Sequence, residues 1–294
     1  MSCLIGIDIG GTKIKHGVLD DKITLVHAGE DETPKGGTAI LDLICKRISG
    51  YLSFGKTIST VCVSSAGIID SDRGVVLEAN ARLMPDYMGT EISARVTGEF
   101  GLPCFVENDV NCAAIAEYFA GAAKGYRSCL MLTVGTGIGG AYIADGKLWK
   151  GHSGSACEVG YLHMEGGSFE ELAATSTLVK RTAKRLLLDP DSISGKWVFE
   201  KGREGNRDCM EEIDRLCDIL AKGIANLCCV LNPEAVVIGG GISVQEDWLR
   251  PRIDKGLDRY LIPVIRKGTD LVFAKFQNHA GMIGACYASG MLKG

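Results

Sequence analysis

The chain has no long run of lysine or arginine, and its formal net charge is only -4. Proteins that bind nucleic acid or an anionic membrane usually have a basic patch, so neither partner is expected here. No apolar run approaches the ~20 residues that a membrane-spanning helix needs. The first residues, Met1-Ser-Cys-Leu4, also lack the basic and apolar regions of a signal peptide. We therefore expect a cytoplasmic protein that acts on small molecules.

Cysteine pairs with metal-binding spacing are missing as well. The twelve cysteines lie scattered in apolar runs without Cys-x-x-Cys or Cys-x-Cys, and the five histidines are widely spaced. This pattern is typical of reduced core cysteines and predicts no zinc site. Proline-rich and low-complexity segments are absent, so we expect no flexible tether. With 46% hydrophobic residues, the 294-residue chain can form one large domain or two linked lobes.

The sequence contains three glycine-rich turns, and each directly follows an apolar run that is typical of a strand. They are Asp8-Ile-Gly-Gly-Thr-Lys13, Thr133-Val-Gly-Thr-Gly-Ile-Gly-Gly140 and Val236-Val-Ile-Gly-Gly-Gly-Ile-Ser243. Glycine allows a backbone to take positive φ and to approach a ligand closely, so successive N–H groups can face phosphate oxygens. A single turn of this kind also fits a plain hairpin, but three favour a phosphate-handling enzyme.

The first two turns lie in matching surroundings. Residues 3–9 and 14–19 predict a hairpin around the first turn, and residues 129–134 and 141–144 repeat that pattern around the second. Two similar lobes with a ligand cleft between them are therefore predicted.

Strands and helices alternate elsewhere, which indicates an α/β fold. Helical or buried-strand periodicity is present at 38–49, 60–64, 110–123, 173–187, 210–231 and 235–238. The stretch 189–206 is rich in proline, glycine and charge, so we expect solvated loop there, with a short helix near 196–200 and no chemistry.

Five motifs follow one another along the chain: Asp8-x-Gly-Gly-Thr-Lys13, Glu107-Asn-Asp109, Gly135-Thr-Gly-x-Gly-Gly140, Glu158-x-Gly160 and Gly239-Gly-Gly-Ile-Ser243. This ordered set resembles the ROK family of bacterial sugar kinases over essentially the whole chain. The resemblance implies an α/β fold of the actin-like (ribonuclease H-like) type, a duplicated two-lobe ATPase with an interlobe cleft. It also implies ATP and Mg²⁺ as cofactors, transfer of phosphate to a sugar hydroxyl, and a homodimer.

The same resemblance predicts where the lobes begin and end. The N-terminal actin-like lobe is expected at residues 1–110 and the C-terminal lobe at 111–280. A C-terminal helix at about 281–294 is expected to pack back on the first lobe.

Phosphoryl transfer requires positioning, charge neutralisation and a group that accepts the hydroxyl proton. Asp109 follows a strand and begins a predicted helix, a position that aims a carboxylate at a ligand, and by resemblance it is the catalytic base and also contacts the substrate. The alternative interpretation is that Asp109 only caps that helix.

The resemblance also assigns the nucleotide and metal contacts. Asp8 is expected to face Mg²⁺ through water, because Mg²⁺ loses its hydration shell reluctantly. Thr12 and Thr136 are expected to bind phosphate oxygens, and Lys13 to add a positive charge unless it is solvated surface. The full predicted set of nucleotide contacts is Asp8, Gly10, Gly11, Thr12, Lys13, Gly135, Thr136, Gly137, Gly239, Gly240 and Gly241.

For the sugar, the resemblance implies hydroxyl contacts from Asn80 and Asn108. It also implies contacts from the carboxylates of Glu158 and Glu170, although Glu171 competes with Glu170 for the second position. Carboxylates discriminate strongly between sugars because a missing partner leaves a desolvated charge.

Two departures from the family pattern bear on the substrate. Tyr161 stands where typical members have histidine, and Met164-Glu-Gly-Gly-Ser168 replaces a cysteine-rich zinc loop. This variant resembles the β-glucoside kinases, which phosphorylate the 6-hydroxyl of glucosyl units such as cellobiose. Glucokinase, fructokinase and N-acylmannosamine kinase remain alternatives with the same machinery.

A sugar-sensing protein is the alternative outside the enzymes. Some relatives are repressors with an N-terminal DNA-binding module, but here the first glycine turn begins at residue 8, which is not expected to leave room for one. His163 is expected to be structural or exposed to solvent.

Overall fold

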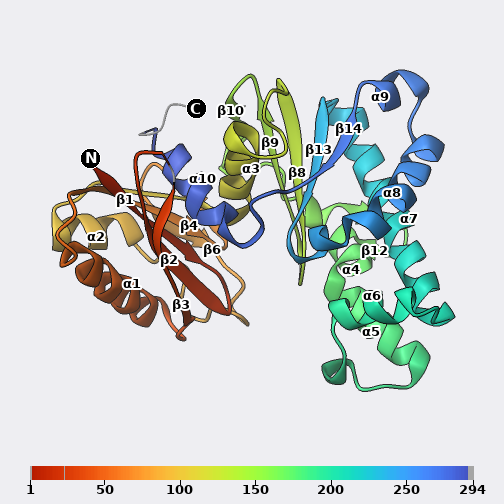
Figure 1. Ribbon diagram of the computed structural model, residues 1–294, viewed down its shortest axis with the longest axis horizontal. Helices are drawn as coiled ribbons and strands as arrows, with labels where there is room; N and C mark the ends of the chain where they lie inside the picture. Colours follow the sequence, from red (N-terminus) through yellow and green to blue (C-terminus); the bar gives the residue numbers. More distant parts are fainter. Residues whose placement is uncertain (1, 23, 291–294) are drawn as a thin grey trace. The chain divides into compact units, whose positions relative to one another are not determined.

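The computed structural model describes residues 2–22 and 24–290 (Figure 1). Their contacts divide the chain into two compact units. Unit 1 comprises Met1–Gly121, Leu148–Ala156 and Asn278–Gly294, and unit 2 comprises Ala122–Lys147 and Cys157–Gln277. Over the described residues, none of the helices is long and apolar enough to cross a membrane.

These units differ in two respects from the lobes expected at 1–110 and 111–280. Helix α3 (Asp109–Ala120) stays with unit 1 because it packs on α10 (Ala280–Ala288), where a Cβ on Gly284 would overlap the carbonyl of Cys112. Residues 148–156 also return to unit 1. Residues 291–294 of the expected terminal helix lie outside the described residues.

Unit 1 contains a five-stranded sheet in the order β3-β2-β1-β4-β7. Its strands are β1 (Cys3–Ile9), β2 (Lys13–Leu19), β3 (Leu25–Glu32), β4 (Ile58–Ser65) and β7 (Cys104–Asn108). Strands β1 and β2 form the hairpin that the sequence predicts, and β1, β4 and β7 run parallel. A separate antiparallel hairpin joins β5 (Ile68–Asp70) to β6 (Val75–Glu78).

Helices cover both faces of this sheet. Helices α1 (Gly37–Leu52) and α2 (Ile92–Phe100) cover the face that buries Ile5, Ile7 and Ile9 of β1. Because side chains alternate along a strand, Leu4 and Asp8 lie on the opposite face, next to α3 and α10. The alternation that builds the core therefore places Asp8 against α10.

Unit 2 repeats this strand arrangement, with the order β10-β9-β8-β13-β14. Its strands are β8 (Ser128–Val134), β9 (Ile138–Ala144), β10 (Lys147–Leu148), β13 (Ala235–Gly239) and β14 (Asp270–Phe273). Strands β8 and β9 form an antiparallel hairpin, and β8, β13 and β14 run parallel, as β1, β4 and β7 do in unit 1. The duplicated α/β fold is therefore confirmed.

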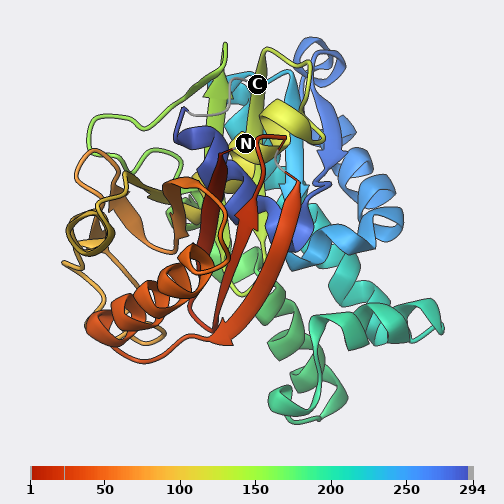
Figure 2. The ribbon, with the colours of Figure 1, turned by 60° about the vertical axis from the view of Figure 1, so that its left-hand side comes forward.

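The core of unit 2 lies between the sheet and its helices, with Leu130, Leu132, Val236 and Ile238 buried against α7 (Arg207–Leu231). Figures 1 and 2 show α7 and α8 (Glu246–Tyr260) side by side in teal and blue. The helices are α4 (Phe169–Ala173), α5 (Thr175–Leu186), α6 (Gly195–Arg203), α7 (Arg207–Leu231), α8 (Glu246–Tyr260) and α9 (Pro263–Lys267). A short hairpin of β11 (His163–Met164) and β12 (Gly167–Ser168) precedes them.

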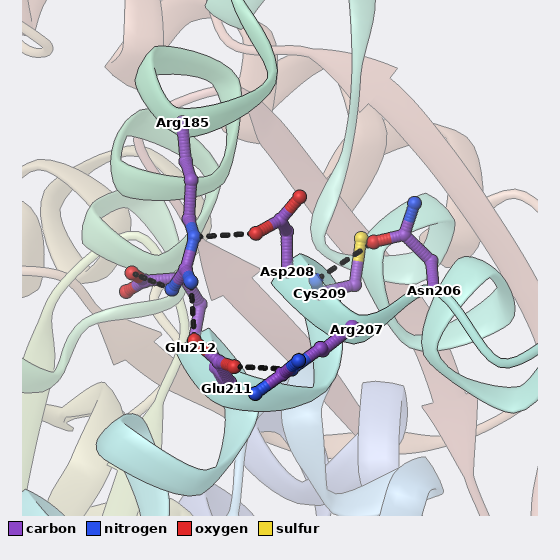
Figure 3. A network of polar contacts seen from close by, with 7 residues as sticks. All are labelled: Arg185, Asn206, Arg207, Asp208, Cys209, Glu211 and Glu212. Atoms are coloured by element: carbon purple, nitrogen blue, oxygen red, sulfur yellow. Dashed lines mark hydrogen bonds and ion pairs between the residues drawn. The ribbon is translucent and has the colours of Figure 1, made fainter.

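Charged side chains join the end of α5 to the start of α7 (Figure 3). Arg185, in the last turn of α5, pairs with Asp208 at 2.6 Å and with Glu211 and Glu212 in the first turns of α7. Asn206 caps α7 by accepting a hydrogen bond from the N–H of Cys209 at 3.0 Å. Positive charge at a helix C-terminus and negative charge at an N-terminus both interact favourably with the helix dipole. These contacts connect the end of α5 to the start of α7.

Candidate active site

Asp8 lies near the end of β1, beside the first glycine turn. Its Oδ1 accepts a hydrogen bond from Ser64 Oγ of β4 at 2.7 Å. The first turn of α10 passes so close that a Cβ on Gly281 would overlap Asp8 Oδ1 and lie 2.8 Å from Ser64 Oγ. Burial raises the pKa of the Asp8 carboxyl, against the opposing effects of the Ser64 hydrogen bond and the charge of Lys15. A nearby cation would stabilise the charged form.

The chemistry at Asp8 fits Mg²⁺. This ion prefers oxygen ligands and usually keeps several waters, so one or two protein carboxylates suffice. Over residues 2–22 and 24–290, no group of three or more His, Cys, Asp and Glu side chains could hold a metal ion. A single carboxylate, with water and phosphate oxygens as further ligands, is the arrangement that these residues suit.

The first glycine turn is tight, with the N–H of Gly10 donating to the carbonyl of Lys13 at 3.0 Å. Thr12 is exposed at its tip, where a phosphate oxygen can reach it. Lys13 instead forms an exposed ion pair with Glu30 of β3. A phosphate contact by Lys13 would have to compete with this pair, so its role stays a prediction.

Asp109 is the first residue of α3, directly after β7. The cap of this helix is Asn108, whose Oδ1 accepts hydrogen bonds from the N–H groups of Val110 at 2.9 Å and Asn111 at 3.0 Å. The cap position is therefore Asn108 and not Asp109. The Asp109 carboxylate accepts hydrogen bonds from Asn108 Nδ2 at 3.1 Å and from the N–H of Val110 at 2.9 Å, so it shares one N–H of the first helical turn with the cap.

The amide of Asn108 is fully occupied within the protein. Besides the cap and Asp109, its Nδ2 donates to the carbonyl of Gly67 at 2.8 Å. These four hydrogen bonds use both donors and both acceptor lone pairs of a side-chain amide. Asn108 thus orients Asp109, and a sugar hydroxyl would have to displace one of these bonds.

Negative charge gathers around the start of α3. Burial raises the pKa of the Cys112 thiol well above its ordinary value, and the carboxylates of Glu107, Asp8 and Asp109 raise it further. Unit 1 therefore brings the predicted metal contact and the predicted base into one neighbourhood.

Asn80 lies in an exposed turn two residues after β6. Its Oδ1 accepts a hydrogen bond from the N–H of Arg82 at 3.0 Å, an arrangement that stabilises the turn. The same turn packs Leu83 against the first glycine turn, because a Cβ on Gly11 would lie 3.4 Å from Leu83 Cβ. The structure therefore brings Asn80 and the first glycine turn near each other.

In unit 2, the second glycine turn lines a pocket of about 490 Å³. Gly135, Thr136 and Gly241 form part of its wall, and the apolar side chains of Val179 and Phe199 form another. A Cβ on Gly135 or Gly241 would meet no protein atom within 4 Å, so these glycines leave open space that a ligand can fill. Such a pocket suits a flat aromatic base beside a phosphate turn.

Gly137, Gly239 and Gly240, three more of the predicted nucleotide contacts, instead lie tightly against other protein atoms. A Cβ on Gly239 would overlap the side chain of Met131, and Gly240, with φ of 78°, lies against the backbone of Val134. Gly137 faces the carboxylate of Glu170 in the same way. Of the three glycines in the third turn, only Gly241 lines the pocket.

One wall of this pocket was not predicted from the sequence. Gly195, Lys196 and Phe199 line it, although the stretch 189–206 was expected to be surface without chemistry. Thr175 also lines it, and its buried Oγ1 has no hydrogen-bond partner within the described residues. The apolar periodicity of α6, which buries Val198 and Phe199, is the signal that could have indicated this wall.

Glu158 and Glu170 lie close enough to interact. Burial raises the pKa of the Glu158 carboxyl, and the charge of Glu170 raises it further. Glu170 Oε2 accepts a hydrogen bond from the N–H of Ile138, in the second glycine turn, at 2.9 Å. Glu171 instead completes a capping box of α4 with Ser168. The structure therefore brings Glu170, and not Glu171, beside Glu158.

Tyr161 and His163 lie just beyond Glu158. Tyr161 ends a short 3-10 turn and is 77% exposed, with Leu162 40% exposed next to it. His163 is exposed in β11, as expected.

Two units with the same strand order define an actin-like, two-lobe α/β protein. Residues 4–289 match the ROK family, and the chain belongs to this family.

Similar proteins cover almost the whole chain. The glucokinase of Streptomyces coelicolor is 33% identical, over 97% of this chain and 96% of the glucokinase. The β-glucoside kinase of Klebsiella pneumoniae is 29% identical, over 97% of this chain and 95% of that kinase. The structure of a ROK family glucokinase from Streptomyces griseus, in complex with glucose and AMPPNP, has a TM-score of 0.86 at 30% identity, over 98% and 99% of the two chains.

These relatives support the carbohydrate kinase class that the motifs predict. They support a particular closeness to β-glucoside kinases only weakly, because a glucokinase matches at higher identity.

Proposed function

We propose that this chain is an ATP-dependent carbohydrate kinase that phosphorylates the 6-hydroxyl of a glucosyl unit, with a β-glucoside such as cellobiose as its preferred substrate. The observation that supports catalysis most directly is the turn at the start of α3. There Asn108 both caps the helix and donates a hydrogen bond to the Asp109 carboxylate. A carboxylate held in this way can serve as a general base.

In the proposed reaction, Asp109 accepts the proton of the sugar hydroxyl as its oxygen attacks the γ-phosphorus of ATP. Asn80, Glu158 and Glu170 bind the other hydroxyls of the sugar. The N–H groups of the glycine turns at Gly10 and Gly135 bind phosphate oxygens and stabilise the negative charge of the transition state. The apolar pocket of unit 2 binds the adenosine, with Val179 and Phe199 against the base.

Asp8 would hold Mg²⁺, directly or through water. When bound, the ion neutralises charge on the phosphate groups. Asp8 itself stays oriented by Ser64 and by the first turn of α10.

The proposed preference for β-glucosides rests on the exposed surface after Glu158. The exposed ring of Tyr161 and the neighbouring Leu162 offer apolar area to a group attached to the sugar. The K. pneumoniae relative is consistent with this preference. The second candidate is a glucokinase, which the higher identity of the S. coelicolor relative favours.

The test is ATP-dependent phosphorylation of a sugar panel by the purified protein, with Mg²⁺ and no added zinc. The panel contains glucose, cellobiose, an aryl β-glucoside, fructose, mannose and N-acetylmannosamine. We expect the highest kcat/KM for the β-glucosides. A preference for free glucose would contradict the proposed substrate but agree with the proposed kinase activity. No turnover of any sugar would contradict the kinase activity itself.

A further inference from the structure

Glu107 is a buried carboxylate directly before the Asn108–Asp109 pair, and both of its oxygens contact donors of the protein. Oε1 accepts from the N–H of Asn108 at 2.9 Å and from Asn111 Nδ2 at 3.0 Å. Oε2 accepts from Ser71 Oγ at 2.9 Å and pairs with Lys150 Nζ at 2.6 Å. The side chain of Glu107 is only 8% exposed. A carboxylate so far removed from water is stable in its charged form only with such partners.

These partners come from separate parts of unit 1. Asn108 and Asn111 belong to the turn and first helical turn that contain Asp109, and Ser71 lies between β5 and β6. Glu107 therefore connects the turn that holds the proposed base to two other segments. Of its four partners, only Lys150 has a positive charge.

Lys150 lies in Leu148–Ala156, a segment of unit 1 whose two ends continue into unit 2. The segment is a compact loop, closed by the N–H of Ala156 donating to the carbonyl of Lys150 at 3.2 Å. Gly151, with φ of 67°, packs against Ala156 within this loop. The next residues of the chain are Cys157 and Glu158. A contact that fixes the position of Lys150 therefore also restrains the start of the segment that leads to Glu158, a proposed sugar contact.

We propose that the Lys150–Glu107 ion pair is a positioning device for the sugar site. It holds the turn of Asp109 and the loop 148–156, which precedes Glu158 in the chain, in fixed positions within unit 1. Neither side chain is a catalytic residue, because each acts through its neighbours. This proposal rests on the proposed function for its kinetic consequences, but its structural consequence can be measured independently.

The test compares three variants with the wild type. Lys150→Met removes the charge and keeps most of the side-chain volume, and Lys150→Arg restores a cation. Lys56→Met is the matched control, because Lys56 is an exposed lysine of unit 1 outside the described ion pairs. Thermal unfolding of each variant establishes that it is folded.

The first readout is amide hydrogen exchange, which requires no substrate. In Lys150→Met we expect faster exchange in two segments, residues 107–113 and residues 148–158, and wild-type exchange in the distant helix α7. Lys150→Arg is expected to restore protection, and Lys56→Met to leave it unchanged. Unchanged exchange in both segments of Lys150→Met would overturn the proposal, even if no sugar were turned over by any form of the protein.

The second readout separates positioning from general stability. Small displacements of positioned groups reduce catalysis strongly, so we expect kcat/KM for the sugar to fall about tenfold or more in Lys150→Met. KM for ATP is expected to stay unchanged, because neither Lys150 nor Glu107 is among the proposed nucleotide contacts. Equal losses for ATP and sugar would contradict a local positioning role. Lack of turnover by the wild type would instead contradict the proposed function and leave the exchange result to decide the ion pair.

Discussion

The two units share one strand order but differ in what surrounds their glycine turns. In unit 1 the turn follows Asp8, a buried carboxylate whose pKa is raised by burial, and α10 packs against it through Gly281. In unit 2 the turn follows Thr133 and opens on an apolar pocket, where a Cβ on Gly135 would meet no protein atom. The same backbone arrangement thus provides a charged, tightly packed site once and an open, apolar site once.

This difference predicts opposite responses to added bulk. Gly281 of unit 1 should be needed for packing and catalysis, whereas Gly135 of unit 2 should be needed only for the ligand. Four predictions follow, from the largest expected effect to the smallest, and the first two test this contrast.

Gly281→Ala should be the most damaging change in unit 1. The new Cβ would overlap Asp8 Oδ1, so the carboxylate or α10 must shift. We expect kcat to fall about 100-fold, since a shift near 1 Å has that effect. Overpacking should lower the free energy of unfolding by about 1–3 kcal/mol. Steady-state kinetics and urea unfolding measure both.

Gly50→Ala is the matched control, because Gly50 of α1 has no other atom within 4 Å of its Cβ position. Higher helix propensity should there increase stability by up to about 1 kcal/mol without affecting kcat. Full activity of Gly281→Ala would contradict the tight packing of Asp8.

Gly135→Val should weaken nucleotide binding and change nothing else. The valine side chain would occupy the open space of the pocket, so we expect KM for ATP to rise about tenfold or more. The melting temperature and the sugar KM should stay at wild-type values. Gly98→Val, at an open helical position of unit 1, is the control. An unchanged ATP KM would mean that the nucleotide does not bind in this pocket.

The raised pKa of Glu158 predicts how sugar binding depends on pH. Burial and the charge of Glu170 raise the pKa of Glu158, so it takes up a proton at higher pH than an ordinary glutamate. Protonation removes acceptor capacity, and the sugar KM should rise as pH falls through this raised pKa. The folded state binds this proton more tightly than the unfolded state, so the contribution of Glu158 to stability increases over the same range.

The corresponding variant is Glu158→Gln. Its sugar KM should be high at every pH and should no longer rise as the pH falls. Its melting temperature at neutral pH should be no lower than that of the wild type. A wild-type pH profile in this variant would show that another group controls binding.

The smallest effect is expected for Glu171. Glu171→Gln weakens the capping box of α4 and should reduce stability by at most about 1 kcal/mol, with kinetics unchanged. Glu170→Gln should show the reverse, a raised sugar KM with little change in melting temperature. If Glu171→Gln raised the sugar KM instead, the two residues would have exchanged roles.

The sequence predicted the parts of the fold that depend on local pattern. Both glycine hairpins and the duplication follow from alternating apolar residues around the turns at Gly10 and Gly135. It did not distinguish Asn108 from Asp109 as the cap of α3, because both residue types cap helices well. Only the hydrogen bonds of the folded chain separate their roles.

Long-range packing explains what the sequence analysis missed. The Lys150–Glu107 pair joins residues far apart in the chain, and no periodicity predicts that 148–156 returns to unit 1. Helix α6 was expected only as a short element near 196–200, because the charged residues around Val198 and Phe199 weaken the apolar pattern of the sequence. The pocket wall that Phe199 forms was therefore not expected either.

The most direct test of the central claim is Asp109→Asn, measured both for turnover and for sugar binding by calorimetry. Removing a general base should lower kcat by about 10²–10⁴-fold. The variant should still bind the sugar, since an asparagine oxygen can accept the hydrogen bond from Asn108. Asp21→Asn, at an exposed position of unit 1, is the control. Wild-type turnover in Asp109→Asn would contradict the assignment of Asp109 as the base.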